Sequence, residues 1–513
     1  MQQLQRTNNT RRNITWGFAG RALTLLCPFI TRTALIYALG AEYLGISSLY
    51  TSILQVLSLA ELGFATAVVY SMYKPVAEGD VAQVAAYLNY FKRVYRWVGL
   101  AILAMGLAVA PFLESLVEGS WPDDVNLRTA FFIYLANTVI GYFLFAYKQS
   151  LLNAYQRNDA VSKVAMVTAA LQCAVQVAIL AAAPNFYAFA LVLPACTVFS
   201  NLATAWAVRR LLPEFGDRAL REQSLTSTQR RDVRKRVAGL VFNQICGTTR
   251  DSFASIFVSS FLGLTLVAAY SNYFVVLSAL HGILTVICTS MTAAVGHSVV
   301  TEAKDKNAAD LRLFVFLYAL LSIVCAAVML ACYQPFMALW VGNTLVLPFT
   351  IPLLMTIYFY ALTMGDIRSV YVNATGIWWE QRWRALFEAI ANLALDWMLV
   401  QLLGLPGVIV GTLISLFLIN FVYGSHLAFK YYFGLEKARM YYIDHAVYLG
   451  ACAAICTVTY FVVNLIPDGD IAMLLLKVAA AVACSVVLLL AAFGWTERFK
   501  VALSFMRRAF RKR

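Results

Sequence analysis

Long apolar runs separated by short polar stretches extend along the whole chain. Each run reaches about 18 residues or more, which an α-helix needs to cross roughly 30 Å of hydrocarbon. The short alternating segments typical of a membrane β-barrel strand are not evident. We therefore predict fourteen transmembrane helices, at residues 13–39, 44–73, 84–112, 128–155, 160–183, 186–208, 237–262, 264–299, 309–333, 347–374, 384–403, 406–430, 443–465 and 471–494.

Composition agrees with a polytopic, all-α membrane protein. The chain is 61% hydrophobic and only 13% charged, whereas soluble proteins are about 25% charged. Most of its forty Lys and Arg residues fall in alternate loops, above all in 209–236 and 498–513. By the positive-inside rule, both termini are expected in the cytoplasm and the protein in the cell membrane. Basic rims facing an anionic leaflet account for the net charge of +14 without nucleic acid.

The basic stretch 209–236 divides the chain after six predicted helices. Shifting the sequence by 223 residues places Leu39-Gly40 on Leu262-Gly263 and Tyr95 on Tyr318. We therefore predict two pseudo-symmetric six-helix lobes around a central cavity, an arrangement typical of transporters. The expected parts are an N-lobe (1–208), a cytoplasmic linker (209–236), a C-lobe (237–433), and an extra helix pair with a basic cytoplasmic tail (434–513).

Four strings carry a family resemblance: GAEYLGISSLYTSILQVLSLAELGFATAVVYSMYKPVAEGD (40–80), KQSLLNAYQRN (148–158), FLGLTLVAAYSNYFVVL (261–277) and AVGHSVVTEAKD (294–305). They resemble bacterial polysaccharide transporters of the multidrug/oligosaccharidyl-lipid/polysaccharide (MOP) exporter superfamily, over about residues 11–440. The resemblance implies a V-shaped bundle of two lobes around a central cavity. It also implies a flippase for undecaprenyl-pyrophosphate-linked oligosaccharide in cell-surface polysaccharide biosynthesis. Expected partners are this lipid-linked oligosaccharide, membrane lipids and the polysaccharide polymerase machinery.

Basic residues inside the apolar runs are candidates for binding the substrate headgroup. Arg21 and Arg32 are eleven residues apart, so three helical turns place them on one face. Charged residues at this depth normally face a bundle interior or water, and guanidinium groups match phosphate oxygens well. We expect Arg21, Arg250 and Arg32 to form a ladder for the pyrophosphate, with Lys148 and Arg368 as further headgroup contacts. The alternative for Lys148 is snorkelling to the membrane interface.

Glu61 lies within the second apolar run and is expected at the middle of a helix. One interpretation is a charge pair with Arg21 or Arg32. The other is coupling to H⁺ or Na⁺, because a buried carboxylate can change its charge between conformations.

Asp251 and Asp366 present the same choice between coupling and charge pairing. They lie beside Arg250 and Arg368 in sequence and could neutralise them across a helix contact. Small polar residues are also expected to line the cavity, or alternatively to bond neighbouring helices: Asn243, Ser278, Thr285 and Thr289.

Nothing in the sequence indicates catalysis. The ten cysteines include no CxxC pair and the four histidines are scattered, so neither a metal site nor a cofactor is expected. A membrane polymerase or glycosyltransferase would be expected to carry a large external loop or a soluble domain, and the predicted loops are short. Two alternatives remain within the same superfamily, a peptidoglycan-precursor flippase of the lipid II type and a multidrug exporter.

Overall fold

The computed structural model describes residues 20, 23–24, 26–61, 64–216 and 223–511. Within these ranges a few side chains, including those of Glu61 and Asn243, also lie outside the description. Every regular element of the described chain is helical, which confirms the all-α prediction. Packing divides the chain into two compact lobes, Met1–Ala268 and Ala269–Arg513.

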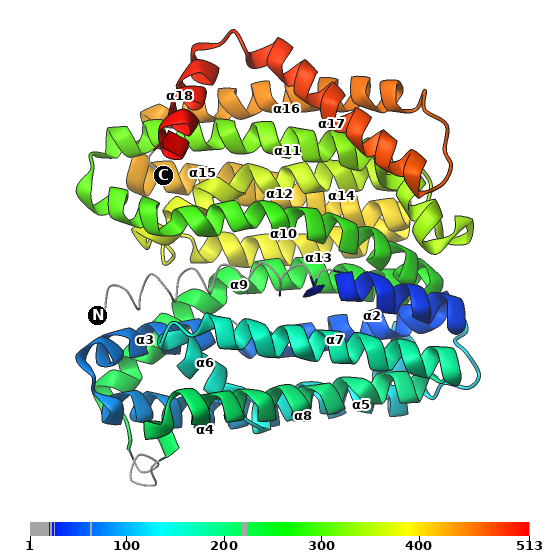
Figure 1. Ribbon diagram of the computed structural model, residues 1–513, viewed down its shortest axis with the longest axis vertical. Coiled ribbons are helices and arrows are strands. Elements are labelled where there is room, and N and C mark those ends of the chain that lie inside the picture. Colours follow the sequence, from blue (N-terminus) through cyan, green and yellow to red (C-terminus); the bar gives the residue numbers. More distant parts are fainter. Residues whose placement is uncertain (1–19, 21–22, 25, 62–63, 217–222, 512–513) are drawn as a thin grey trace. The chain divides into compact units, whose positions relative to one another are not determined.

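The first lobe consists of α-helices joined by short connections (Figure 1). The chain forms a helix at Leu26–Ala38, followed by α2 (Ala41–Leu57), a 3₁₀ turn (Ser58–Glu61), α3 (Phe64–Glu78), α4 (Val81–Val109), a 3₁₀ segment (Ala110–Leu116), α5 (Leu127–Phe143), α6 (Tyr147–Ala154), α7 (Asn158–Ala182), α8 (Phe186–Leu211), a 3₁₀ turn (Pro213–Gly216) and α9 (Ser227–Leu262).

The boundary between the lobes falls inside α10 (Leu264–Thr301). The second lobe continues with α11 (Lys304–Val341), a 3₁₀ turn (Asn343–Leu345), α12 (Thr350–Thr375), α13 (Arg382–Leu403), α14 (Leu405–Ser415), the π-helical segment η6 (Leu416–Tyr423), α15 (Gly424–Ala428), a second π-helical segment (Phe429–Phe433), a 3₁₀ turn (Leu435–Lys437), α16 (Ala438–Val463), α17 (Ile471–Phe493) and α18 (Glu497–Arg511).

Helices occupy every predicted apolar run, but not every run is one straight helix. Ten helices of the described chain are long and apolar enough to cross a membrane, or eleven if the bent pair α5–α6 counts as one span. The remaining predicted runs correspond to the short helix Leu26–Ala38, the broken pair α2–α3 and the more polar α9. The expectation that Glu61 lies mid-helix is wrong, because the 3₁₀ turn Ser58–Glu61 separates α2 from α3. Such a turn within a helical run often marks strain or a hinge.

Polar residues at the start of several helices explain why these begin where they do. Asp80, Asn126, Asn185 and Asp470 each accept a hydrogen bond from a backbone N–H in the first turn. This bond satisfies one of the N–H groups that a helix start leaves without a partner. At the start of α9, Thr226 forms a reciprocal capping box, so the last part of the predicted linker belongs to a helix.

In the first lobe, α2 packs against α9, and α4 against α5. A Cβ atom added to Gly45 of α2 would lie 2.2 Å from the carbonyl oxygen of Leu264, so only glycine allows this close approach. The buried apolar side chains of this lobe form one contiguous cluster, whose members range along the sequence from Leu35 to Ala268. Helix α9, which the sequence assigned to the C-lobe, therefore shares its packing with the first lobe.

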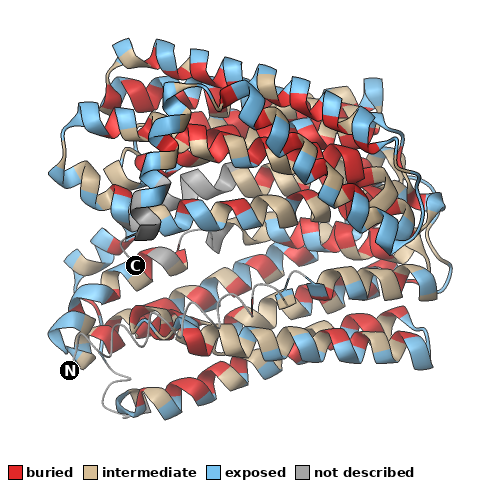
Figure 2. Ribbon diagram, turned by 45° about the horizontal axis from the view of Figure 1, so that its top comes forward, coloured by how far each residue is buried: buried red, intermediate tan, exposed pale blue. Residues whose placement is uncertain are grey.

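In the second lobe, α11 packs against α12, α16 and α17. The predicted extra helix pair is α16–α17, and its outer surface is apolar: Phe461 is 67% exposed and Leu475 is 64% exposed. Buried residues follow the inner faces of the helices and exposed ones the outer faces (Figure 2). Large exposed apolar side chains on transmembrane-length helices are suited to contact with lipid. The chain is a multi-pass helical membrane protein.

Candidate functional site

A stripe of polar side chains runs along α13 in the second lobe. Arg384, Glu388, Asn392 and Asp396 follow one another at intervals of four residues, so they share one face of the helix. All four are buried, with exposures from 0% to 7%. Burying charged groups is costly unless each is paired and hydrogen-bonded, so the partners of this stripe determine what it can do.

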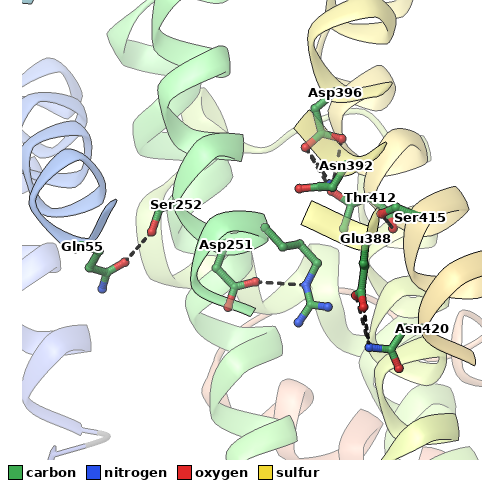
Figure 3. Close-up of polar contacts among 10 residues, drawn as sticks. Gln55, Asp251, Ser252, Glu388, Asn392, Asp396, Thr412, Ser415 and Asn420 are labelled. Atoms are coloured by element: carbon green, nitrogen blue, oxygen red, sulfur yellow. Dashed lines mark hydrogen bonds and ion pairs between the residues drawn. The ribbon is translucent and has the colours of Figure 1, made fainter. Parts of the chain in front are cut away.

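The first half of the stripe is part of a continuous hydrogen-bond chain. Arg384 Nη1 donates to Glu388 Oε2 at 2.7 Å. Asn420 Nδ2 donates to both carboxylate oxygens of Glu388, at 3.2 and 2.9 Å, as Figure 3 shows. Arg368 Nη2 in turn donates to Asn420 Oδ1 at 2.9 Å. One carboxylate therefore connects α12, α13 and η6.

The π-helical segment η6 explains how Arg368 is held. Two backbone carbonyls of this segment accept hydrogen bonds from Arg368, and π-helical turns are frequent at functional sites. Arg368 Nη1 donates to the carbonyls of Asn420 (2.8 Å) and Phe421 (3.1 Å) and to Ser425 Oγ (2.8 Å). In this conformation, Arg368 is buried and bonded to protein acceptors.

Two glycines provide the space for these guanidinium groups. A Cβ atom added to Gly365 would lie 3.2 Å from Arg368 Nη2. A Cβ atom added to Gly424 would lie 2.9 Å from Cδ of Arg384 and 3.2 Å from Nη1 of Arg368. Close helix contacts in membranes commonly use small residues in this way.

The second half of the stripe forms a smaller oxygen-rich cluster with α14. Asn392 Nδ2 donates to Asp396 Oδ2 at 3.1 Å and to Thr412 Oγ1 at 3.2 Å (Figure 3). Thr412 Oγ1 lies 3.4 Å from both carboxylate oxygens of Asp396. The amide oxygen of Asn392 is buried and has no hydrogen-bond partner. A carboxylate, an amide oxygen and a hydroxyl are the types of ligand that hard cations take.

Gly411 allows α14 to approach this cluster. A Cβ atom added there would lie 2.4 Å from Asp396 Oδ1 and 2.9 Å from the Asp396 backbone nitrogen. Similarly, a Cβ atom on Gly407 would lie 2.0 Å from the carbonyl oxygen of Leu399. The cluster thus depends on a glycine-mediated contact between α13 and α14.

A third polar group in this lobe contains Asp366, one of the predicted site residues. Tyr318 of α11 donates to Asp366 Oδ2 at 2.7 Å, and His281 Nε2 of α10 lies 3.0 Å from the same oxygen. Cys288 lies close enough to both Asp366 and Tyr318 to interact with them. Asp366 therefore bonds toward α10 and α11, whereas Arg368, two residues later, bonds toward η6 and α15.

In the first lobe, Arg250 Nε lies 3.5 Å from Oδ1 of its neighbour Asp251, and the Arg250 side chain is 12% exposed. This is an ion pair between adjacent residues of α9 and not across a helix contact, and the roles predicted for Arg250 and Asp251 stay predictions. The next residue, Ser252, donates to Gln55 of α2 at 3.0 Å (Figure 3). Lys148 of α6 lies 4.7 Å from the centroid of the Phe145 ring.

Other predicted site residues are either dispersed or outside the description. Arg21, and the side chains of Glu61 and Asn243, lie outside the described residues, so the pairing of Glu61 with Arg21 or Arg32 stays a prediction. Arg32 lies on the helix Leu26–Ala38 and is half-buried.

Three predicted polar residues lie on α10. Ser278 is exposed. Thr285 and Thr289 donate to carbonyls of their own helix, at 3.0 and 2.9 Å. In this conformation, the two threonine hydroxyls are therefore used within α10.

Sequence analysis missed the residues of the α13 stripe and their partners on η6 and α14. A signal was present, because a polar residue at every fourth position of an apolar run predicts one buried polar face. The stripe begins at Arg384, which is the first residue of the predicted helix 384–403. Among the described residues, there is no group of three or more His, Cys, Asp and Glu side chains that could hold a metal ion.

No protein-family model matches the sequence, and no curated protein matches it. Solved structures do match. An inward-facing multidrug resistance MATE family transporter of the MOP superfamily superposes with a TM-score of 0.59 and 13% identity, covering 82% of this chain and 96% of that one. The lipid II flippase MurJ, in an inward closed conformation, gives a TM-score of 0.59 and 14% identity, covering 93% of this chain and 98% of that one. The chain has the MATE/MurJ fold.

A Vibrio cholerae MATE transporter, VcmN, agrees with this fold at a TM-score of 0.55 and 15% identity, covering 87% of this chain. The two-lobed, all-α architecture predicted from the sequence is therefore confirmed. At these identities, the likeness describes the fold alone.

Proposed function

We propose that this protein is a flippase that moves undecaprenyl-pyrophosphate-linked oligosaccharide across the cytoplasmic membrane by alternating access, for cell-surface polysaccharide biosynthesis. The fold it shares with MATE transporters and MurJ supports membrane transport. The signature strings at 40–80, 148–158, 261–277 and 294–305 support the polysaccharide branch.

The observation that carries the proposal is the extent of the match to a lipid-substrate flippase. That match covers 93% of this chain, whereas the MATE match with the same TM-score covers 82%. The difference is similar in size to the pair α16–α17, which follows the twelve helices predicted for the two lobes. An additional helix pair with an apolar outer surface suits a substrate whose long polyprenyl tail must stay in lipid.

The second candidate is a peptidoglycan-precursor flippase, and the match to MurJ is the observation that favours it. Both candidate substrates combine a pyrophosphate, a polyprenyl tail and a glycan, so intramembrane arginines suit either one. Only the glycan distinguishes them. Binding of each lipid to the purified protein, in competition with the other, separates the two functions.

For the headgroup, we propose Arg32 and Arg250 as contacts, together with Arg21 in the ladder. Arg32→Gln and Arg250→Gln should each weaken binding of the lipid-linked oligosaccharide by about tenfold, because each removes a charge-assisted phosphate contact. Arg209→Gln, at the exposed end of α8, is the matched control and should bind as the wild type does. Unchanged binding in both test variants would contradict this assignment.

We also propose that ion coupling occurs in the second lobe. Asp366 is bonded to two titratable groups, His281 and Tyr318, which suits a proton. Asp396 accepts from the amide nitrogen of Asn392, and its carboxylate lies 3.4 Å from the hydroxyl of Thr412. The buried amide oxygen of Asn392 has no hydrogen-bond partner, and with the Asp396 carboxylate and the Thr412 hydroxyl it offers oxygens of the kind that suit Na⁺.

Two variants distinguish these ions in proteoliposomes. If protons drive transport, Asp366→Asn abolishes the response to a pH gradient and Asp396→Asn leaves it intact. If Na⁺ drives transport, the result is reversed, with a sodium gradient as the driving force. Full responses to both gradients in both variants would place coupling elsewhere.

A further inference from the structure

An open groove of about 430 Å³ lies between α7 and α8 of the first lobe. Its lining includes Arg157, Lys163, Val167, Phe199, Trp206 and Arg210. The two helices are antiparallel neighbours, since only three residues connect them and they pack along their lengths. None of the headgroup or coupling residues discussed above lies in this groove.

The groove is charged at one end and apolar along the rest. Arg157 and Lys163 lie at the start of α7, and Arg210 lies at the end of α8, so all three cations meet at the same end of the helix pair. Farther along, the walls are Val167 on α7 and Phe199 on α8. At about 1.5 Å per residue, Phe199 lies roughly 16 Å from Arg210 along the helix. That is close to the depth of one leaflet, about 15 Å.

The charged end favours an anion. Asp159 is the single carboxylate of the lining, against three cations, and Arg157 Nε contacts it at 3.0 Å. The net charge of the lining is therefore positive. The guanidinium carbon of Arg210 lies 5.4 Å from the centroid of the Trp206 ring, which orients this cation. Tryptophan is enriched at the level of lipid headgroups, where its ring is half in hydrocarbon and half in water.

We propose that this groove binds one anionic phospholipid of the leaflet that it faces. The phosphate lies between Lys163 and Arg210, and one acyl chain follows Val167 and Phe199 toward the middle of the membrane. The gradient from cationic to apolar lining, over the depth of one leaflet, matches the gradient from headgroup to tail in such a lipid. This site is separate from the proposed transport function and does not depend on it.

The test measures phospholipid binding to the purified full-length protein in detergent by native mass spectrometry. Phosphatidylglycerol and phosphatidylcholine with identical acyl chains are titrated in parallel. The wild type should bind phosphatidylglycerol more tightly. The double variant Lys163→Gln/Arg210→Gln should lose about thirtyfold of that affinity, since each cation near the surface contributes about fivefold.

Arg209→Gln is the matched control, because Arg209 is the exposed neighbour of Arg210 at the same end of α8 and does not line the groove. It should retain wild-type affinity. Ala203→Phe fills the apolar part of the groove without changing its charge, and should also weaken binding of the intact lipid. Thermal unfolding of each variant verifies that the fold is retained.

Two competition arms identify the source of the phosphate. Water-soluble glycerol phosphate should not displace the phospholipid, because it lacks an acyl chain for the apolar wall. Complete displacement by glycerol phosphate would reduce the site to a phosphate site and overturn the proposal. Preferential displacement by polyprenyl phosphate would make the groove a substrate site and would also overturn the proposal. Equal affinity for phosphatidylglycerol and phosphatidylcholine would overturn it as well.

Discussion

Removing the carboxylate of Glu388 should destabilise the second lobe strongly. This side chain is 1% exposed and accepts hydrogen bonds from Arg384 at 2.7 Å and from Asn420 at 3.2 and 2.9 Å. Glu388→Ala leaves Arg384 buried without this counter-charge. Breaking a buried ion pair costs about 3–5 kcal/mol, whereas hydrogen bonds between membrane helices are worth about 1–2 kcal/mol. We expect a loss of about 3 kcal/mol.

Thermal unfolding in detergent, followed by intrinsic fluorescence, measures this loss. For a lobe of this size, about 3 kcal/mol lowers the Tm by roughly 6–12 °C. Glu436→Ala is the control, since that carboxylate is exposed in a turn and its removal should change stability by less than about 0.5 kcal/mol.

The double variant Arg384→Leu/Glu388→Leu separates the two contributions. It removes both charges and should be more stable than Glu388→Ala, because no unpaired charge remains. A Tm for Glu388→Ala within 2 °C of the wild type, or additive losses in the double variant, would refute the ion-pair account.

Three further predictions concern the second lobe. Gly411→Ala should destabilise the second lobe by about 1–3 kcal/mol in the same thermal assay, because the added Cβ atom would lie 2.4 Å from Oδ1 of Asp396. Gly450→Ala is its control and should be tolerated, since no atom lies within 4 Å of the added carbon. Arg368→Lys should lower the Tm by several degrees, since one ammonium cannot reproduce four bonds to η6 and α15; an unchanged Tm would contradict this. Asp444→Asn should weaken the ion pairs that connect α16 to α11 and α18, so amide hydrogen exchange in α18 should accelerate while that in α12 stays unchanged.

The positions of most membrane-length helices could be predicted from the sequence because the membrane imposes their length and apolar character. A segment that crosses hydrocarbon must satisfy its own backbone and remain apolar for about 20 residues. The breaks could not be predicted in this way. Ser58–Glu61 and the 49° bend between α5 and α6 lie inside apolar runs, where hydropathy does not distinguish a turn from a helix.

The site was predicted less completely. Arg368 and Asp366 were selected because charges are rare inside apolar runs, but their partners depend on which helices are neighbours. The sequence of one apolar run does not show which helices pack beside it. Asn420 bonds Glu388 and Arg368 across the contact between η6 and α13, which only the fold brings together. The stripe from Arg384 to Asp396 has a period that the sequence alone shows, with one polar residue at every fourth position.

Transport of a lipid-linked glycan between leaflets is the central claim, and flipping in proteoliposomes tests it most directly. Vesicles containing the purified protein are loaded with undecaprenyl-pyrophosphate-linked oligosaccharide, and a glycosidase that cannot enter the vesicles reports the fraction of glycan outside. With an ion gradient imposed, the protein should move most of the protected glycan to the enzyme within minutes, while protein-free vesicles keep about half protected. Protection that stays at the protein-free level, with lipid II or a cationic dye transported instead, would contradict the proposed function.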